Sequence, residues 1–448
     1  MKKVTDSLRL IQSIRLVNRN KLLMKKNKKR RSKKRNAKKS LHSRYSRIHY
    51  KLECLKAYKR INNRVAPVSK KRWKYNIKIP KIFCLYEEPE QVLAIIKKIA
   101  SLEDAEHINE IFIDHSQCVK HDLSAEILLA NVVKSLNLVK GPHFRIKGAF
   151  PRCKKMKRLL SSIGVVSDTA ASKYCLKNEK NLKLYKRLSD PFEEDAATAS
   201  FFCQDKKNAA TSGFTDYLKS CLKLISASLD SDEESKLNKY LGEVLGNAED
   251  HSGLKLWQLV GYLDSSDRDN LYCEIVIFNI GKTFLDTFLD KENAPIVNDK
   301  RVEYVNKHKG ILSEEQLTLV YALQQNASSK LDEEVDRGQG TKYLIDLFHH
   351  FTDKSNEICA SKDYSENCKP KMFILSGNAI LKMDGTYNPL INEKEKMVYA
   401  LNKSNDLLMA PDKKYINALR NEECFPGTVI YIRYSLQETK LIGNEDGT

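Results

Sequence analysis

The distribution of charge along the chain constrains its folding more than any other feature of the sequence. Residues 1–80 carry 29 Lys and Arg residues against two acids, Asp6 and Glu53, a net charge of +27. The remaining residues hold 49 Lys and Arg against 55 acids, so the total of +21 conceals a mildly acidic body of −6. A segment as basic as the first one repels itself and buries little. We therefore predict a basic, partly disordered arm at 1–80, ahead of the globular part.

The arm predicts a polyanionic partner, and nucleic acid fits it best. Lys and Arg would release counterions on binding without sequence preference, and interleaved aromatic residues such as Trp73 could stack on unpaired bases. An anionic membrane, another acidic partner or a plain solvated or targeting tail also fits the composition. The cations that we assign to nucleic acid lie in the densest run: Lys25, Lys26, Lys28, Lys29, Arg30, Arg31, Lys33, Lys34 and Arg35.

The apolar and cysteine patterns bear on the cellular compartment. No window approaches about eighteen consecutive apolar residues, and no apolar leader precedes a small-residue cleavage site. The 11 cysteines include no C-x-x-C pair, which is typical of free thiols in a reducing compartment. We expect no membrane span and a cytoplasmic protein, associated with the nucleoid or nucleus if the arm binds nucleic acid.

Two folded regions follow the arm. Hydrophobic periodicity predicts a small α/β domain at 81–166, then a polar linker at 167–205, a larger domain at 206–435 and a polar tail at 436–448. The elements predicted in the small domain alternate strand and helix: strand Ile82–Leu85, helix Val92–Ile99, strand Ile111–Ile113, helix Ser124–Leu136, strand Phe144–Ile146 and helix Lys155–Ser162.

The larger domain contains a helix with an unusual polar face. Residues 231–250 open with the capping-box spacing Ser231-x-x-Glu234 and continue with an apolar stripe at helical spacing. Glu243, Asn247 and Asp250 fall close together on the helix, away from that stripe. A carboxylate one turn from an amide can activate a water while the amide oxygen binds Mg²⁺. A solvated polar face explains the same spacing.

Three glycine-containing motifs come later in the same domain. The apolar strand Tyr272–Phe278 ends at Asn279, where a polar side chain could contact a base and Gly281 could let a ligand approach. Gly338, Gly340 and Thr341 precede a helical pattern, and glycines at a helix N-terminus expose backbone N–H groups to phosphate. Gly427 and Thr428 lead into the strand Val429–Arg433.

In this order the motifs resemble those of the GHKL ATPase superfamily of gyrase B subunits, MutL proteins, heat-shock chaperones and histidine kinases. The resemblance implies an α/β chain whose larger domain has the Bergerat fold, an α+β two-layer sandwich that binds ATP and Mg²⁺. It implies Glu243 as the general base and Asn247 as the Mg²⁺ ligand. The implied nucleotide-binding residues are Asn247, Asp250, Asn279, Gly281, Gly338, Gly340, Thr341 and Thr428.

The chain departs from the family at the base-contact motif. Asn279 replaces the Asp that accepts a hydrogen bond from the adenine amino group, and Thr283 replaces the second glycine. An amide oxygen can still accept that bond, without charge assistance. Adenine selectivity is therefore less secure than phosphate binding.

The segment between Lys282 and Arg337 occupies the place of the family's ATP lid. It contains the capping-box spacing Ser313-x-x-Gln316, and it could close over the nucleotide or be a static insertion. The resemblance to MutL proteins implies dimerisation in the ATP-bound state. A protein partner could read the lid, which would make slow ATP hydrolysis a conformational switch.

The small domain has a second, shorter resemblance. Residues 112–129 are similar to STAS-type domains, in which a strand ending in Asp leads into a helix that begins near a Ser. In regulatory members that Ser is phosphorylated, which would correspond to Ser124, although a plain N-cap is the simpler explanation of Ser124. Two alternatives to the ATPase follow: a partner-switching protein kinase that acts on Ser116 or Ser124, and a non-hydrolysing ATP-binding scaffold.

Overall fold

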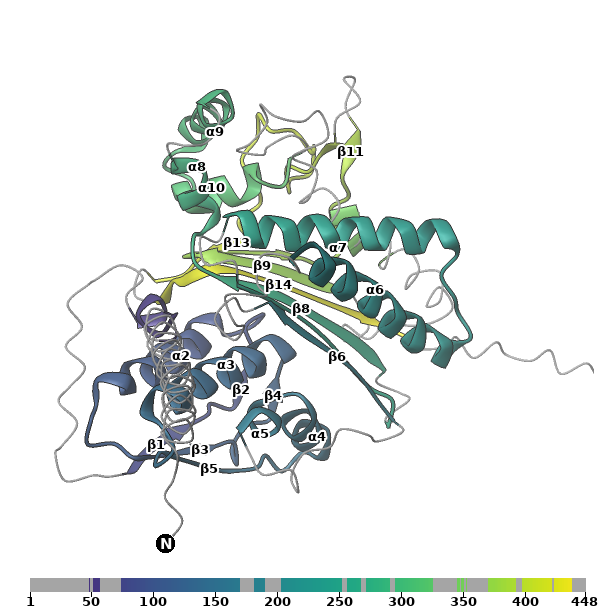
Figure 1. Cartoon of the computed structure of the whole chain (residues 1–448). Coiled ribbons are helices and arrows are strands. Elements are labelled where there is room, and N and C mark those ends of the chain that lie inside the picture. Colours follow the sequence, from purple (N-terminus) through teal and green to yellow (C-terminus); the bar gives the residue numbers. More distant parts are fainter. Residues whose placement is uncertain are drawn as a thin grey trace, which may run out of the picture. The chain divides into compact units, whose positions relative to one another are not determined.

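Figure 1 shows the computed structural model of the chain, which divides into two units, Met1–Tyr50 and Lys51–Thr448. Of the first unit only Ile48 is described, and all that follows concerns the second unit. The described residues of the second unit are 51–56, 74–169, 181–189, 203–251, 256–266, 271–290, 295–324, 345–346, 348–349, 352, 370–391, 397–420 and 423–436.

A three-stranded parallel sheet forms the centre of the small domain. Its order is β1 (Lys74–Lys78), β3 (Glu110–Asp114), β5 (Arg145–Ala149), and a short parallel pair joins β2 (Ile82–Phe83) to β4 (Lys120–His121). The helices are α2 (Pro89–Ser101), α3 (Leu123–Lys140), α4 (Lys154–Ser162) and α5 (Val165–Thr169). The alternation of strand and helix predicted from the sequence is therefore confirmed, with element ends shifted by a few residues.

Strand β1 lies inside the segment that the charge pattern assigned to the arm. It pairs in register with β3, and Ile77 on β1 is buried in the domain core. Alternation of Lys74, Asn76 and Lys78 with Tyr75 and Ile77 gives one outward and one inward face. The boundary predicted at residue 81 was wrong, because a strand with a charged or polar residue at every second position still buries its other face.

The larger domain is built on a seven-stranded antiparallel sheet of order β13-β10-β9-β14-β8-β7-β6. A two-stranded sheet pairs β11 (Leu390–Ile391) with β12 (Met397–Val398). The strands of the large sheet are β6 (Leu182–Ser189), β7 (Trp257–Asp264), β8 (Tyr272–Ile280), β9 (Lys371–Gly377), β10 (Ala379–Met383), β13 (Ile416–Ala418) and β14 (Phe425–Ser435). The strand β6 contradicts the linker predicted at 167–205, because eight of those residues pair with β7.

Helices cover one face of this sheet. The helices α6 (Cys203–Leu222), α7 (Ser231–His251) and α10 (Glu314–Tyr321) share an apolar cluster with alternate residues of its strands, such as Ile275 and Ile277 of β8. The helices α8 (Phe284–Leu289) and α9 (Pro295–His308) precede α10 in the chain.

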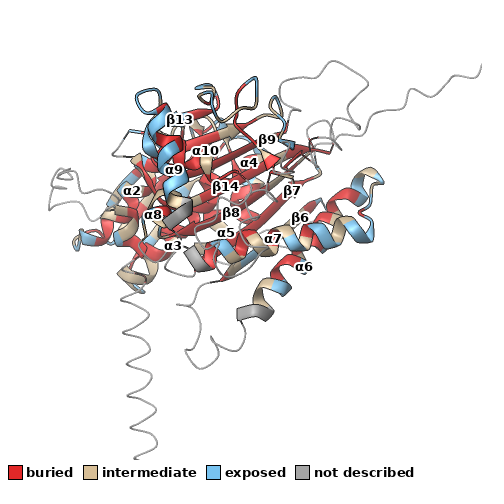
Figure 2. Cartoon of the chain, turned by 90° about the horizontal axis from the view of Figure 1, so that it is seen from above, coloured by how far each residue is buried: buried red, intermediate tan, exposed pale blue. Residues whose placement is uncertain are grey.

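The opposite face of the sheet is also buried. A second apolar cluster unites residues of the small domain with Val276 and Phe278 of β8 and with Val429 and Tyr431 of β14. Figure 2 shows these central strands buried along most of their length. The two-layer sandwich expected from the resemblance therefore has its second sheet face covered, which agrees with the nearly continuous apolar sequence of β8.

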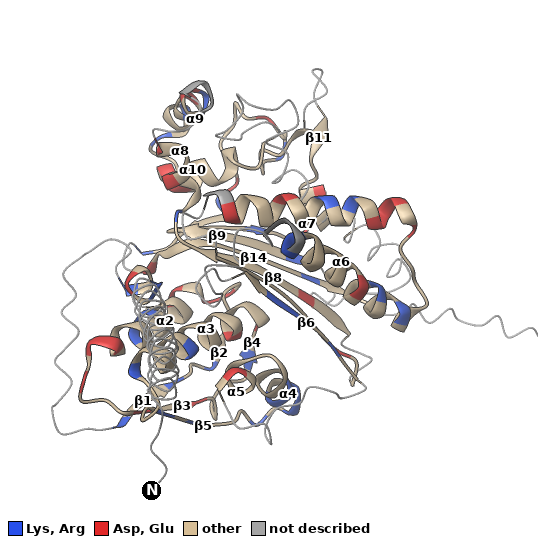
Figure 3. Ribbon diagram, viewed as in Figure 1, with Lys and Arg blue, Asp and Glu red and all other residues tan. Residues whose placement is uncertain are grey.

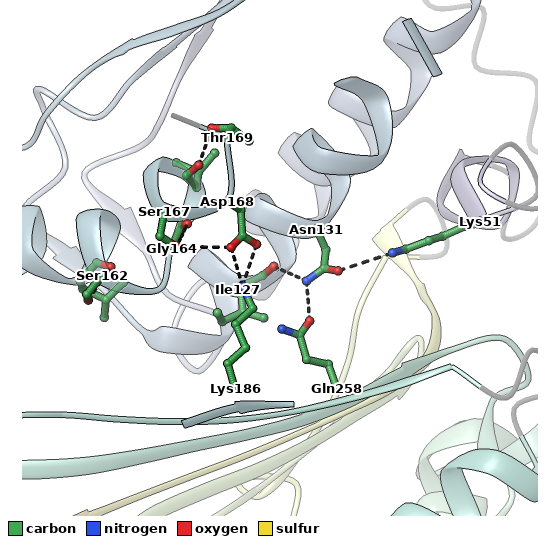
Figure 4. Close-up of polar contacts among 12 residues, drawn as sticks. Lys51, Ile127, Asn131, Ser162, Gly164, Ser167, Asp168, Thr169, Lys186 and Gln258 are labelled. Carbon is green, nitrogen blue, oxygen red and sulfur yellow. Dashed lines mark hydrogen bonds and ion pairs between the residues drawn. The ribbon is translucent and has the colours of Figure 1, made fainter. Parts of the chain in front are cut away.

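Polar contacts also join the small domain to the sheet. Asn131 on α3 donates from Nδ2 to Oε1 of Gln258 on β7 at 2.7 Å, and both side chains are buried (Figure 4). On α4, Nε of Arg158 lies 3.1 Å from Oδ2 of Asp264, at the end of β7. Buried polar pairs of this kind fix one relative placement of two layers, because any other placement would leave a polar group without a partner.

Candidate functional site

A row of side chains crosses four strands at one end of the large sheet, on the face that the helices cover. Trp257 of β7 pairs with Asn279 of β8, Asn279 pairs with Thr428 of β14, and Thr428 pairs with Ser376 of β9. The residues two positions away on β8, β14 and β9 belong to the helix-side apolar cluster. Because side chains alternate along a strand, this row faces the helices as well. We call these four residues the polar row.

Hydrogen bonds connect the members of the polar row. The side chain of Asn279 is 7% exposed, and its Oδ1 accepts from the backbone N–H of Thr428 at 2.7 Å. Oγ1 of Thr428 lies 3.4 Å from Oγ of Ser376, which donates to the carbonyl oxygen of Gly427 at 3.0 Å. Two motifs that the sequence resemblance treated separately are thus in direct contact.

Two glycines allow the chain to form this end of the sheet. Gly281 has a φ of 141° and donates its backbone N–H to the carbonyl oxygen of Pro426 at 3.1 Å. Gly427 has a φ of 127°, and a Cβ added there would lie 2.3 Å from the carbonyl oxygen of Asn279. The close approach at Gly427 is therefore to the backbone of β8. A glycine is required at Gly427 whether or not a ligand binds.

The helix α7 is held against the sheet by a residue that the sequence analysis did not select. Glu249 is 5% exposed; its Oε1 accepts from Nε1 of Trp257 at 2.8 Å, and its Oε2 lies 3.3 Å from Nζ of Lys207 on α6. The helix starts with a reciprocal cap between Asp230 and Glu233, not with the predicted box at Ser231, because Glu233 N donates to Asp230 Oδ1 at 2.8 Å. In the sequence, Glu249 is marked only by its place beside the apolar stripe of the helix and by a Trp eight residues later, and this pattern predicts its role only weakly.

The predicted catalytic face of α7 points away from the sheet. Glu243 is half-buried and Asn247 is exposed, and neither makes a hydrogen bond to Asn279 within the described part of the chain. The side chain of Asp250 lies outside the described residues, as do Gly338, Gly340 and Thr341. The structure therefore brings together Asn279, Gly281 and Thr428 of the predicted site, and it leaves Glu243 and Asn247 on a neighbouring surface.

The segment after β8 is folded over residues 284–290 and 295–324. Thr283, which stands where the resemblance expects a glycine, caps α8 in a reciprocal box with Asp286. The box predicted at Ser313 and Gln316 is confirmed at the start of α10. Nε2 of Gln316 then donates to the carbonyl oxygen of Ile416 on β13 at 3.2 Å, so α10 packs as part of the domain. Residues 325–337 of the expected lid segment lie outside the described residues.

Ser124 is a residue that would be phosphorylated if the chain were a partner-switching protein kinase, and it is inaccessible. It is completely buried, and its Oγ donates to Oδ1 of Asp122 at 2.6 Å. Asp122, not Ser124, is the N-cap of α3 and accepts from the backbone N–H of Ala125 at 2.8 Å. The first residue of α3, Leu123, donates its N–H to Glu274 on β8 at 3.4 Å. A phosphate on Ser124 would require α3 to separate from the sheet.

One group of carboxylates among the described residues has the spacing of a cation site. It consists of Glu53, Glu103 and Asp104. The ammonium group of Lys56 already occupies it, 2.7 Å from Glu53, 2.8 Å from Glu103 and 2.9 Å from Asp104. These carboxylates therefore serve an ion-pair network, not a metal.

The small domain also carries exposed positive charge. Lys74 and Lys78 on β1 and Arg145 and Lys147 on β5 are exposed on the outward face of the parallel sheet (Figure 3). Lys74 and Arg145 lie at the same register position, on either side of Glu110 on β3. One of the four, Lys147, is paired with Glu110 at 2.8 Å. The cations from Lys25 to Arg35 lie outside the described residues.

Comparison with models of protein families, with curated proteins and with solved structures finds no match. Among the described residues, no helix has the length and apolar character needed to cross a membrane.

Proposed function

We propose that the chain binds a Mg²⁺ nucleoside triphosphate, ATP by its resemblance to GHKL proteins, and hydrolyses it slowly as a conformational switch. The observation that carries this proposal is the hydrogen bond from Thr428 N to Asn279 Oδ1. It joins two motifs far apart in the sequence at one end of the sheet, beneath the helix that carries Glu243 and Asn247. That combination supports a nucleotide site at this end of the sheet, beside the polar face of α7.

In the proposed site each group has a separate task. Asn279 and Gly281 contact the base, and Thr428 keeps Asn279 in position. Asn247 binds Mg²⁺ through its amide oxygen, and Glu243 activates the attacking water. Asp250 supports this face of α7, and the backbone N–H groups of Gly338, Gly340 and Thr341 bind the phosphates.

Because Asn247 is exposed and Glu243 is only half-buried, the proposed site is open to water in this structure. Electrostatic catalysis is effective where water is excluded, and an exposed amide and half-buried carboxylate do not by themselves exclude it. A segment that closes over α7 when the triphosphate binds would complete the site. The segment between Lys282 and Arg337 is the proposed lid, and the surface formed on its closure would bind a second copy of the chain or a protein partner.

Titration calorimetry with and without Mg²⁺ tests the nucleotide site. Asn247→Ala should lose the Mg²⁺-dependent part of triphosphate binding, whereas Ser235→Ala, an exposed substitution on the same helix, should not. Unchanged Mg²⁺-dependent binding in Asn247→Ala would remove Asn247 from the site.

Phosphate release tests the catalytic assignment separately. Glu243→Gln should bind the triphosphate as the parent does but lose at least about 100-fold in turnover, because the amide cannot take a proton from water. Glu106→Gln, an exposed substitution in the small domain, is the control and should keep the parent rate. Full turnover in Glu243→Gln would show that another group acts as the base.

We propose that the arm binds nucleic acid, supported by further exposed cations on β1 and β5 of the small domain. Because Leu52 and Leu55 are buried in the core of the small domain and Lys56 pairs with Glu103, the informative truncation removes residues 1–47, which include the cations from Lys25 to Arg35. It should lose most nucleic-acid affinity and most of the salt dependence of binding while it retains triphosphate binding. A truncated chain that binds oligonucleotides as tightly as the full chain would contradict a role for the arm.

A further inference from the structure

The three-stranded parallel sheet of the small domain has one face against helices and one face turned outward. Ile77, Ile111 and Ile113 on the inward face share an apolar cluster with residues of α2 and α3 (Figure 1). Side chains alternate along a strand, so the residues between them point to the other side. We call that side, formed by alternate residues of β1, β3 and β5 from Lys74 onward, the outer sheet face.

An aromatic side chain lies at the centre of the outer sheet face. Phe112 is on β3, the middle strand, and the register places it between Asn76 on β1 and Lys147 on β5. Its side chain is only partly buried, and it belongs to neither of the two large apolar clusters. The ring therefore adds little to the core and is placed to contact a ligand on the surface.

Four cations surround this ring. Lys147 is in register with Phe112, and Lys74, Lys78 and Arg145 each lie two residues farther along a neighbouring strand. Because neighbouring strands are about 4.8 Å apart, one short ligand can reach Phe112 and several of these cations together. Nζ of Lys74 already lies 4.4 Å from the centre of the Phe112 ring, on an exposed and flexible side chain.

Two carboxylates on β3 offset part of this positive charge. Glu110 pairs with Lys147 at 2.8 Å, and Asp114 accepts from the backbone N–H of Ser116 at 2.9 Å. The other three cations of the outer sheet face form no ion pair with another described residue. With four cations against two carboxylates, the outer sheet face remains positive and suits an anionic partner.

We infer that the outer sheet face binds a single-stranded segment of nucleic acid, with one base stacked on Phe112 and phosphates against the surrounding cations. The inference rests on the proposed function, in which nucleic acid is the partner of the arm, and adds a contact on the folded domain. Aromatic side chains stack on unpaired bases, which a duplex does not offer. On binding, the Lys74 side chain moves from the ring to a phosphate.

The shape of the outer sheet face favours a single strand over the other polyanions. Three strands form a surface about 10 Å wide, with helices behind it, whereas the major groove of duplex DNA admits a single helix or a two-stranded ribbon. An acidic protein segment would pair with the cations but would leave the ring of Phe112 without a stacking partner. Only a single strand uses both the charge and the aromatic ring.

The first test measures binding of a labelled single-stranded oligonucleotide, and of the corresponding duplex, to the full chain by fluorescence anisotropy. Phe112→Leu keeps an apolar side chain but removes the ring. It should weaken single-strand binding at least about fivefold and leave duplex binding unchanged. Phe112→Tyr retains an aromatic ring and should bind the single strand as the parent does.

The second test removes two cations from the outer sheet face. Lys74→Gln combined with Arg145→Gln should weaken single-strand binding and reduce the slope of log affinity against log salt by about 1.4, at about 0.7 for each phosphate contact. Lys403→Gln combined with Lys413→Gln removes the same charge from the large domain and should keep the slope of the parent. All four positions are exposed, so these variants should fold.

The outcomes separate the inference from the proposed role of the arm. If the parent binds oligonucleotides but Phe112→Leu and the Lys74 and Arg145 double variant bind the single strand equally well, the inference fails and the arm remains. Equal losses for single strand and duplex in Phe112→Leu overturn the selection of single strands. If the full chain binds neither oligonucleotide, the inference and the role of the arm both fail.

A labelled poly-glutamate peptide tests the acidic-protein alternative. Peptide binding that requires Phe112, together with oligonucleotide binding that does not, would overturn the inference. If Phe112→Leu does not fold, the double variant of exposed cations decides the question.

Discussion

Replacing Gly427 with alanine is expected to destabilise the large domain, even though only one methyl group is added. The added Cβ would lie 2.3 Å from the carbonyl oxygen of Asn279 and 2.9 Å from Cα of Ile280, both backbone atoms that cannot rotate away. The φ of 127° adds backbone strain of about 1–3 kcal/mol for a residue with a side chain. Relief requires β14 to move away from β8 where Thr428 donates to Asn279, and leaving that buried donor without its acceptor costs about 1–3 kcal/mol more.

The predicted loss in the free energy of unfolding is therefore about 2–6 kcal/mol. Gly242→Ala on α7 is a matched control with the opposite expected sign. A Cβ at Gly242 meets nothing within 4 Å, and alanine in a helix interior gains about 0.5–1 kcal/mol over glycine. Urea unfolding, followed by tryptophan fluorescence to which Trp257 beside Asn279 contributes, compares the two variants with the parent. A Gly427→Ala chain as stable as the parent would refute the steric argument.

Two further predictions concern the small domain and its contact with the sheet. Asp264→Asn should lower the free energy of unfolding by about 1–3 kcal/mol, because Asp264 is buried and lies 3.1 Å from Arg158. Urea unfolding measures this loss. An unchanged urea midpoint would mean that the ion pair adds nothing to stability. Burial alone raises the pKa of the Glu126 carboxyl, but His115 and His121 outweigh burial and lower it to about 2. The carboxylate's contribution to the free energy of unfolding should be complete above the unfolded pKa of about 4.5 and be lost as the pH falls towards 2. Glu126→Gln should therefore lose less stability on acidification than the parent does. Equal acid sensitivity in the two proteins would contradict this.

Local sequence patterns predicted the elements that depend on neighbours within a few residues. The box at Ser313 and Gln316 was found where its spacing placed it, since both partners lie in one helical turn. At the start of α7 the same reasoning was one residue out, because Asp230 and Glu233 offer a second pair with identical spacing and form the cap instead. Where two local solutions compete, spacing alone does not choose between them.

The predictions that failed concern residues whose partners lie far away in the sequence. The sequence of β6 resembles a polar linker because β6 is the last strand of the sheet and most of its side chains are only partly buried. Its pairing with β7 is what makes it a strand. The sequence pattern places Ser124 near the start of a helix, where a side chain is usually accessible, but packing of α3 against β8 buries it completely. Glu249 gave almost no sequence signal, since its role depends on where Trp257 and Lys207 meet it.

The sequence by itself determined the separation of a basic arm from an acidic body, the apolar periodicity of the main helices and strands, and the order of the glycine motifs. Only the tertiary structure decided that both faces of the large sheet are buried and that the oxygen of Asn279 faces Thr428. The physical reason is the range of the interactions. Periodicity and helix capping repeat within a few residues, whereas the orientation of the Asn279 amide depends on the register of two strands 149 residues apart in the chain.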